Sequence, residues 1–378
     1  MLSDVRVVDL SRVLAGPYAG QILGDLGADV IKIERPGCGD DTRSWGPPFL
    51  PGSPGTAAYY ATANRNKRSR AVDLADAAQR GKLLALVDEA DVLIENFRVG
   101  RLAGYGLDSK TLMARNPRLV YCSITGFGSD GPHADRAGYD ALIQAMGGMM
   151  SITGPGPAQP TKVGVAVTDL STGLYAVIAI LAALRERDAS GKGQHVEVSL
   201  LDTQVSLLAN VAMAYMVSGK VPEPLGNSHA TVVPYQTFHT ADKPMVIAVG
   251  NDGQFRSLCG ALGETWHEDP RFATNPGRVA NRLVLVSAMA ALLGRRGRVE
   301  WLGVLGDAGV PCGPVNDLSD VAQDPQVRHR ELLMHADDGE TPCLRSPLRF
   351  SRTPITRYSA PPHLNEHPDA VFAPRRVG

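Results

Sequence analysis

The sequence predicts an α/β fold built around a mostly parallel sheet. Short runs rich in β-branched residues recur through the first third of the chain, and helical patterns separate them. Strands that alternate with helices in this way form βαβ units, whose strands run parallel. The chain has 378 residues, of which 44% are hydrophobic and 20% are charged. This composition is sufficient for a large buried core and lies far from that of disordered chains.

The expected elements follow one another in a regular order. Strands are expected at residues 5–9, 29–34, 91–94, 119–124 and 195–200, with helices at 16–26, 75–90 and 169–187 between them. Residues 35–69 are rich in glycine, proline and polar residues and too many for an ordinary connection, so we expect them to cover a site. The helix at 169–187 is apolar on nearly all sides, which is typical of a buried helix.

A second compositional unit begins near residue 222, and the chain is long enough for two domains. We expect a large domain over residues 1–200, a linker helix over 201–221 and a small domain over 222–324. The linker helix corresponds to a helical pattern at 201–216, and the small domain to a strand at 245–249 and helices at 253–262 and 282–293. Residues 325–378 are proline-rich and weakly periodic, and we expect them to complete the large domain as a wrapping tail.

Charge and cysteine usage exclude several classes of protein. The 38 basic and 39 acidic residues give a net charge of -1, which does not favour a nucleic acid or an anionic membrane as partner. The five cysteines lie far apart and the nine histidines show no ligand spacing, so we expect neither disulfides nor a metal site. The most apolar run, 170–184, is shorter than the ~20 residues that span a bilayer. With no signal pattern at the N-terminus, a cytoplasmic protein is expected.

The first strand and helix also resemble the start of a dinucleotide-binding unit, but the glycine spacing does not fit. Residues 15–20 read AGPYAG instead of G-x-G-x-x-G. Pro17 and Tyr18 stand where the backbone would have to approach a pyrophosphate. The sequence therefore favours an ordinary βαβ unit and disfavours NAD.

Cations follow several of the expected strands. Residues 64–70 carry four cations in seven positions. Two interpretations are open: a solvated charged segment, which is favoured, or a segment that binds phosphates. Arg35 and Arg43 flank the same long segment, and Arg98 and Arg101 follow the strand at 91–94. Because open α/β sheets bind ligands at the carboxyl ends of their strands, these cations together favour a phosphorylated ligand.

Asp169 stands at the start of the apolar helix, and two interpretations are open. A helix-capping carboxylate, which accepts backbone N–H groups, is the favoured one. A carboxylate in an apolar surrounding is also usable as a nucleophile. Asp140, which follows Gly138 and Tyr139, is open to the same two interpretations.

Six segments match one known family in order and at matching separations. They read AGP (15–17), GADVIKIERPG (27–37), NKRS (66–69), ENFR (95–98), GYDALIQ (138–144) and VAVTD (165–169). In these segments the chain resembles the class III CoA-transferases, the family of formyl-CoA transferase, carnitine CoA-transferase and α-methylacyl-CoA racemase. The resemblance continues to residues 311–316 and 345–347 and so covers essentially the whole chain.

The resemblance implies a fold, an assembly and a set of substrates. It implies a large Rossmann-like domain plus a smaller α+β domain, in a homodimer whose two chains are interlocked as rings. The substrates are an acyl-CoA and a carboxylic acid acceptor; coenzyme A enters as a thioester substrate and no cofactor is tightly bound.

The resemblance also implies site residues. The nucleophilic aspartate of the family falls on Asp169. The implied CoA-binding residues are Leu14, Ala15, Arg35, Val72, Ala75, Asn96, Phe97, Arg98, Arg101, Ala137, Gly138, Tyr139 and Asp140, where Arg101 substitutes for a family arginine that falls on Gly104. The implied substrate loop consists of Gly250, Asn251, Asp252, Gly253 and Gln254.

The implied chemistry is CoA transfer through an aspartyl anhydride and an aspartyl-CoA thioester. The racemases of the family are the alternative, but they place a histidine where this chain has Tyr139, and a tyrosine with a pKa near ~10 is a poor base. A non-catalytic CoA-binding protein is a further alternative, which the retained Asp169 disfavours. Residues 147–154 resemble transferases that act on dicarboxylates such as succinate, mesaconate or citramalate.

Overall fold

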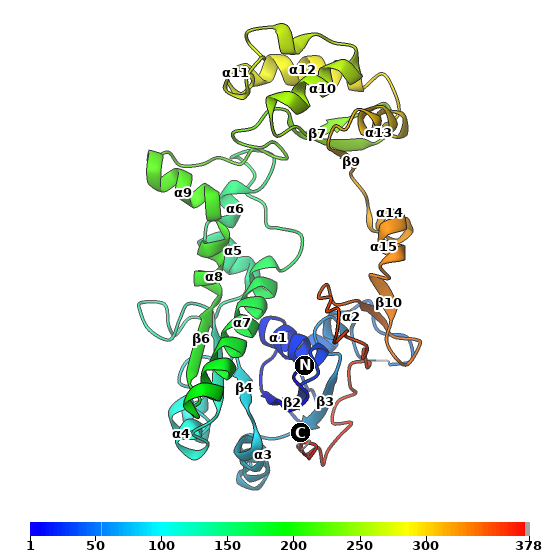
Figure 1. The fold of residues 1–378 in the computed structure, drawn as a ribbon. Helices are drawn as coiled ribbons and strands as arrows, with labels where there is room; N and C mark the ends of the chain where they lie inside the picture. The colour runs from blue at the N-terminus through cyan, green and yellow to red at the C-terminus, as the bar shows by residue number, and fades with distance from the viewer. Residues whose placement is uncertain (54, 375–378) are drawn as a thin grey trace. The chain divides into compact units, whose positions relative to one another are not determined.

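The structure is a computed structural model that describes residues 1–53 and 55–374, and the chain divides into two compact units (Figure 1). The first unit comprises Met1–Met150, Lys162–Lys220 and the segment that starts at Gln326; the second comprises Ser151–Thr161 and Val221–Pro325. Residues 201–220, expected as a linker, thus belong to the first unit, and residues 151–161, expected in the large domain, belong to the second.

The first unit contains a six-stranded sheet in which all strands run parallel. Its strands are β1 (Arg6–Asp9), β2 (Asp29–Glu34), β3 (Lys67–Ala71), β4 (Val92–Glu95), β5 (Val120–Thr125) and β6 (His195–Ser199). They are ordered β3-β2-β1-β4-β5-β6, so the order reverses between β1 and β4. This is the doubly wound topology of Rossmann-like folds, in which ligands bind outside the carboxyl ends of the strands where the order reverses.

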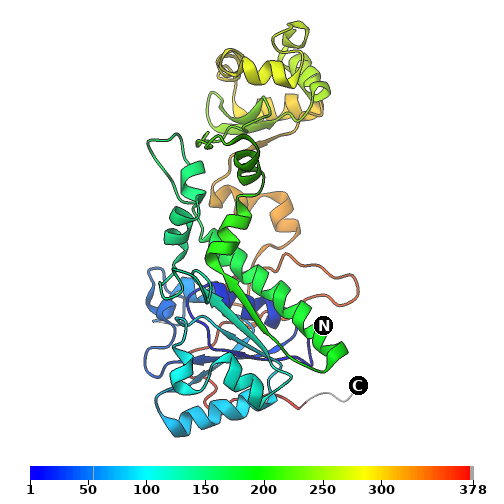
Figure 2. The same cartoon turned by 90° about the vertical axis from the view of Figure 1, so that its left-hand side faces the viewer.

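Helices cover both faces of this sheet (Figure 2). Because side chains alternate along a strand, Val7 and Val92 point to one face and Val8 and Leu93 to the other. The first face is covered by α1 (Ala15–Asp25) and α7 (Val167–Ser190), and the second by α3 (Ala77–Glu89) and α4 (Ser109–Arg115). Strands buried on both faces read as the continuous apolar runs that made them predictable.

The remaining elements of the first unit are short. They are η1 (Asp41–Ser44), α2 (Ala58–Ala61), η2 (Leu102–Tyr105), α5 (Asp140–Met146), α8 (Leu200–Leu207), α9 (Ala209–Ser218) and the antiparallel hairpin β10 (Leu333–His335) and β11 (Pro342–Leu344). The prediction of one helix over 201–216 is wrong, because α8 and α9 meet at an angle of 72°. Near the C-terminus, Ala370 and Phe372 pack into the core beneath α3.

The basic segment 64–70 has a structural role that the sequence did not predict. Most of it forms β3 at the edge of the sheet, and the side chain of Lys67 is fully buried. Lys67 Nζ lies 2.9 Å from Asp9 Oδ2, and Arg65 Nε lies 2.9 Å from Asp25 Oδ1. Both interpretations of this segment are therefore wrong for these two residues: they are neither solvated nor open to a phosphate, but tie β3 to β1 and α1.

Helix α7 differs from its prediction in exposure. It has 24 residues, and by length and composition it is sufficient to cross a bilayer, but half of its most apolar window is buried against α1, β5 and β6. On its other side Leu174, Tyr175 and Ile178 are 48%, 42% and 61% exposed, so the prediction of burial all round is wrong. Helix α9 also exposes apolar side chains, among them Met213, Met216 and Val217.

The second unit has its own sheet and core. Strands β7 (Tyr235–His239), β8 (Pro244–Ala248) and β9 (Cys312–Pro314) form an antiparallel sheet in the order β7-β8-β9. Its helices are α10 (Asp252–Leu262), η3 (Trp266–Glu268), α11 (Asn275–Ala280), α12 (Arg282–Leu293), α13 (Arg298–Asp307) and α14 (Leu318–Gln323). Helices α6 (Met149–Ile152) and α15 (Pro325–His329) lie where the chain passes between the units.

Candidate active site

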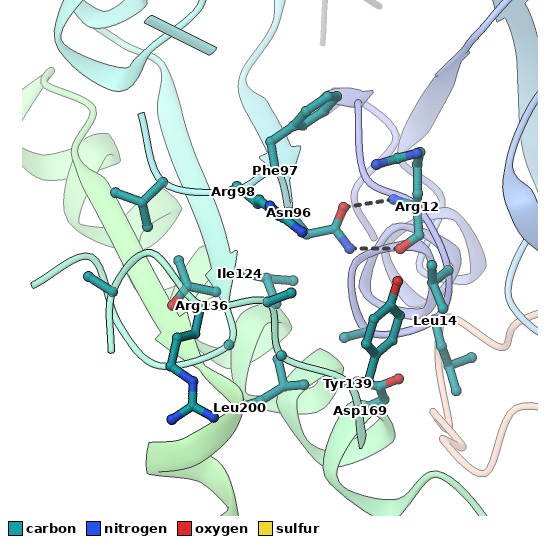
Figure 3. A pocket seen from close by; sticks show the side chains of 18 of the residues that line it. Arg12, Leu14, Asn96, Phe97, Arg98, Ile124, Arg136, Tyr139, Asp169 and Leu200 are labelled. Atoms are coloured by element: carbon teal, nitrogen blue, oxygen red, sulfur yellow. Dashed lines mark hydrogen bonds between the residues drawn. The ribbon is translucent and has the colours of Figure 1, made fainter. Parts of the chain in front are cut away.

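The carboxyl ends of β1 and β4 are joined by one asparagine side chain (Figure 3). Asn96 Oδ1 accepts the backbone N–H of Arg12 at 2.8 Å, and Asn96 Nδ2 donates to the carbonyl of Arg12 at 2.7 Å. Both backbone groups of Arg12 are thus satisfied by a residue 84 positions away. This contact fixes the two loops at the point where the strand order reverses and a ligand is expected.

Two cavities lie at this edge of the sheet and share Arg12, Phe97 and Arg98 in their linings. The first has a volume of about 260 Å³ and contains Asp169. The second has a volume of about 470 Å³ and lies between β2 and the residues that follow β3 and β4. Because they share these lining residues, the two cavities are adjacent.

The structure brings most of the predicted site residues to these cavities. Leu14, Ala15, Asn96, Phe97, Arg98, Ala137, Gly138, Tyr139 and Asp169 line the first. Arg35, Val72, Ala75, Phe97, Arg98 and Arg101 line the second. Asp140 lines neither cavity, and Gly250, Asn251, Asp252, Gly253 and Gln254 belong to the second unit.

Within the second unit, the predicted substrate loop is the start of α10. Asn251 is the N-cap, and its side chain accepts the backbone N–H of Gln254 at 2.9 Å. Gln254 Oε1 accepts the backbone N–H of Gly250 at 2.7 Å. The fully buried Arg278 holds Asp252 at 2.8 Å, which fixes the first turn of the helix.

Two glycines bring the segment before α5 against the end of β5. A Cβ atom on Gly138 would lie 2.5 Å from the Cα atom of Gly126, and a Cβ atom on Gly126 would lie 2.8 Å from the Cα atom of Gly138. Only glycine at both positions permits this approach of the two backbones. The contact carries Tyr139, whose side chain is 62% exposed, to the cavity wall.

Asp169 does not cap its helix, so the favoured interpretation is wrong. It is the third residue of α7, and the cap comes from Asp140 at the start of α5. Asp140 Oδ1 accepts the backbone N–H groups of Thr168 at 2.9 Å and Asp169 at 3.3 Å. Gln144 donates to the other oxygen of Asp140 at 2.6 Å. The Asp169 carboxylate is thereby left unengaged by the helix and lies in the first cavity.

The environment of Asp169 favours its neutral form. Burial raises the pKa of Asp169 to about 7, and the nearby charge of Asp140 adds to the increase. No cation among residues 1–53 and 55–374 forms an ion pair with either carboxylate. Burial and the same two carboxylates raise the pKa of Tyr59, which keeps its phenol neutral. A carboxylate of raised pKa is a stronger nucleophile once it is ionised.

Exposed arginine side chains line the second cavity. Arg35, Arg98 and Arg101 line it and are exposed. Arg35 lies 3.4 Å from Asp41, and Arg101 lies 3.5 Å from the hydroxyl of Tyr105. Exposed guanidinium groups with such weak partners remain able to bind phosphate oxygens.

Several residues at the site escaped the sequence analysis. Arg12, Val13 and Arg136 line the first cavity, and Arg12 lies 3.1 Å from Asp41. Arg12 follows the first strand, so the rule that cations after strands bind the ligand would have identified it. No local pattern marks Arg136, which packs over Phe127 at 5.3 Å. In the part of the chain that the structure describes, no group of three or more metal-ligating side chains is arranged around a common point.

The fold and the site together define an α/β protein with two arginine-lined cavities beside Asp169, a carboxylate whose pKa is raised. The sequence matches CoA-transferase family III over residues 2–368, and the chain belongs to that family. The prediction from the sequence is thus confirmed. The chain is an acyl-CoA transferase, whose substrates are CoA thioesters and which uses no tightly bound cofactor.

The relatives are similar over nearly the whole chain. A succinate–glutarate CoA-transferase of Agrobacterium fabrum is 48% identical over 380 residues, which cover 98% of this chain and 95% of the relative. A succinyl-CoA:glutarate CoA-transferase of Mus musculus is 42% identical over 97% of this chain and 84% of its own. The crystal structure of a CAIB/BAIF family protein from Brucella suis superposes with a TM-score of 0.89, at 49% identity and 97% coverage of both chains.

Proposed function

We propose that this enzyme exchanges CoA between two dicarboxylic acids, with succinyl-CoA as donor and glutarate as acceptor. The relatives described above are named for these substrates, and the resemblance of residues 147–154 to dicarboxylate transferases points the same way. The observation that carries the proposal is Asp169, a carboxylate in no ion pair among the described residues, in a cavity that adjoins a second, arginine-lined one.

In the proposed mechanism Asp169 is the nucleophile. Its carboxylate attacks the thioester carbonyl, the C–S bond breaks, and a mixed anhydride and the CoA thiolate result. The thiolate attacks the aspartyl carbonyl of the anhydride and releases the first acid as a carboxylate, leaving an aspartyl-CoA thioester. The acceptor carboxylate then displaces the thiolate to give a second anhydride. Attack of the thiolate on the acceptor's acyl carbonyl gives the new acyl-CoA and restores Asp169.

The geometry supports these roles. Arg35, Arg98 and Arg101 suit the phosphates of CoA, while the first cavity suits the pantetheine arm and the thioester. Asp140 holds the first turn of α7 and so orients Asp169. A raised pKa near neutrality keeps the carboxylate reactive without a bound cation to weaken it. Each intermediate is activated, so exclusion of water is necessary.

The same proposal includes the domain organisation, the oligomeric state and the cellular compartment. We propose that the two units are the large and small domains, that residues 250–254 of the small domain contact the acyl group, and that two chains interlock as rings. The exposed apolar residues of α7 and of α9 support a homodimer, because a partner chain would bury them. Five free cysteines, of which Cys122 and Cys259 are buried, support a reducing cytoplasm.

The test is mass spectrometry of CoA esters after the enzyme is mixed with succinyl-CoA and a panel of acids. We expect glutaryl-CoA with glutarate and weaker exchange with monocarboxylic acids of equal length. Intact-protein mass spectrometry without an acceptor should detect a CoA adduct on the wild type and none on Asp169→Ala. Exchange by Asp169→Ala at the wild-type rate would disprove the nucleophile. Racemisation of a 2-methylacyl-CoA without any exchange would favour the racemase alternative.

A further inference from the structure

The turn between β1 and α1 is held by side chains from elsewhere in the first unit together with one local contact. Lys32 Nζ donates to the carbonyl of Ser11 at 2.9 Å, and Asn96 satisfies both backbone groups of Arg12. The backbone N–H of Val13 lies 3.2 Å from each carboxylate oxygen of Asp40. The local contact comes from Asp9, which accepts the backbone N–H of Ser11 at 3.0 Å. At Arg12 and Val13 the turn is therefore held by distant residues.

Val13 adopts a backbone conformation that valine avoids. Its φ is +71°, in the left-handed region, where a β-branched side chain is strained. Such a conformation persists only when the surroundings determine it. The hydrogen bonds from Val13 to Asp40 are the contacts that hold it, and Val13 itself lines the cavity that contains Asp169.

Asp40 is suited to this task because it is rigid and charged. Its side chain is fully buried and lies 3.0 Å from the equally buried Lys32 Nζ. It also accepts the backbone N–H and the hydroxyl of Thr42, at 3.0 Å and 2.8 Å. Burial alone would raise the pKa of Asp40, but Lys32 and Thr42 lower it below its usual value, so the acceptor is a carboxylate. Charged acceptors form the stronger hydrogen bonds.

We propose that Asp40 is a positioning residue for CoA: by holding Val13 in the left-handed conformation it places Leu14 and Ala15 in the wall of the cavity. Leu14 and Ala15 directly follow the strained residue and begin α1. If Val13 relaxed to a negative φ, the chain direction at this point would change and both residues would leave the wall. The proposal rests on the proposed CoA site, because the cavity wall matters only if the ligand occupies it.

The experiment compares CoA affinity and thermal stability among variants of the full-length protein. Isothermal titration calorimetry with free CoA gives Kd, and thermal unfolding gives Tm. Asp40→Asn should weaken CoA binding by about tenfold or more, since it removes the charge that holds Val13. Val13→Gly loses a side chain of the cavity wall but adopts a positive φ without strain, so its Kd should depart less from the wild type than that of Asp40→Asn does.

The double variant Asp40→Asn/Val13→Gly is the decisive one. Glycine needs no support to remain left-handed, so CoA affinity should recover from that of Asp40→Asn to that of Val13→Gly. Its Tm should stay as low as that of Asp40→Asn, because Lys32 still lacks its carboxylate. The matched control is Asp25→Asn, which breaks the buried pair with Arg65 at the other end of α1. It should lower Tm and leave Kd unchanged.

Two results would overturn the proposal: unchanged CoA affinity in Asp40→Asn, or a double variant that binds CoA as weakly as Asp40→Asn. A further variant covers the case in which Asp40→Asn does not fold. Val13→Pro keeps the buried Lys32–Asp40 pair but fixes φ near -65°. It should lose CoA affinity, and wild-type affinity in that variant would also overturn the proposal. A wild-type protein that does not bind CoA would contradict the proposed CoA site itself, before any variant is compared.

Discussion

Two groups of carboxylates lie at the same edge of the parallel sheet and differ in burial and in partners: the first group is buried, and the second is half-buried. In the first group each carboxylate has a buried cation: Asp9 with Lys67, Asp40 with Lys32, and Glu34 with Arg43. Burial raises the pKa of each of these carboxylates, but the cations outweigh it and hold the pKa below its usual value. The second group, Asp140 and Asp169, has no such cation, and the pKa of Asp169 rises to about 7.

This difference in partners distinguishes carboxylates with a structural role from a carboxylate suited to react with a substrate. A carboxylate that is paired and hydrogen-bonded on all sides can hold strands and loops in place. The same partners stabilise its negative charge and so lower the nucleophilicity of its oxygens. Asp169 is partly desolvated and forms no ion pair with a cation among the described residues. Its ionised carboxylate is therefore less stabilised and more reactive. Asp140 has a structural and an electrostatic role. It accepts the backbone N–H groups of Thr168 and Asp169, and its negative charge raises the pKa of Asp169.

The largest expected effect follows from removal of the reactive carboxylate. Asp169→Asn should reduce exchange by about 10⁴-fold or more, because the amide does not attack a thioester. It should also stabilise the fold at high pH. The folded pKa of Asp169 is raised, so the wild type loses stability as the pH rises from about 4 to about 7, whereas the variant does not.

Thermal unfolding at several pH values checks this second effect. We expect the variant to exceed the wild type by about 2 to 4 kcal/mol near pH 8 and to match it near pH 4. Equal stability of the two proteins near pH 8 would show that Asp169 is not destabilised by its surroundings. The proposed difference between the two groups of carboxylates would then be contradicted.

The next effect concerns the paired group. Lys67→Met leaves Asp9 buried without its cation and should cost about 3 to 5 kcal/mol of unfolding free energy. Urea denaturation measures it. The double variant Lys67→Met/Asp9→Leu removes both charges and should be more stable than the single variant. If the single variant loses less than about 1 kcal/mol, the pair does not hold β3 to β1 as described.

A smaller effect should appear in the pH dependence of catalysis. The rate requires ionised Asp169, so kcat/KM should rise with pH to a plateau above about pH 7. Asp140→Asn removes a like charge, lowers the pKa of Asp169 and should shift the rise by about one pH unit toward acid. The asparagine oxygen can still cap α7, which limits structural change. A shift toward alkaline pH would contradict the assigned electrostatics.

The smallest effect belongs to an exposed pair and provides the baseline for the others. Arg115 and Asp88 form an ion pair on the surface, with side chains 44% and 41% exposed. Arg115→Gln should change the unfolding free energy by less than about 1 kcal/mol and leave exchange unaltered. A loss as large as that of Lys67→Met would mean that burial does not distinguish these pairs.

The sequence by itself determined the parts of this protein that depend on neighbouring residues. Sequence patterns predicted β1, β2, β4, β5 and β6 within a few residues. The first four are buried on both faces and carry largely hydrophobic segments, whereas β6 lies at the sheet edge and is mostly exposed or half-buried. Ordered motifs identified the family and pointed to Asp169. These signals are local: periodicity and short motifs can be read without knowledge of which residues meet in space.

Only the tertiary structure decided which charges are structural and which are free. The cations of β3 look solvated in the sequence, yet Lys67 finds Asp9, 58 positions away. Asp169 looks like a helix cap, yet the cap comes from Asp140, 28 positions before Thr168. The strained φ of Val13 has no local signature, because Asp40 imposes it across the fold. The physical reason is the same each time: the pKa and role of a buried charge depend on partners that only folding brings within hydrogen-bond distance.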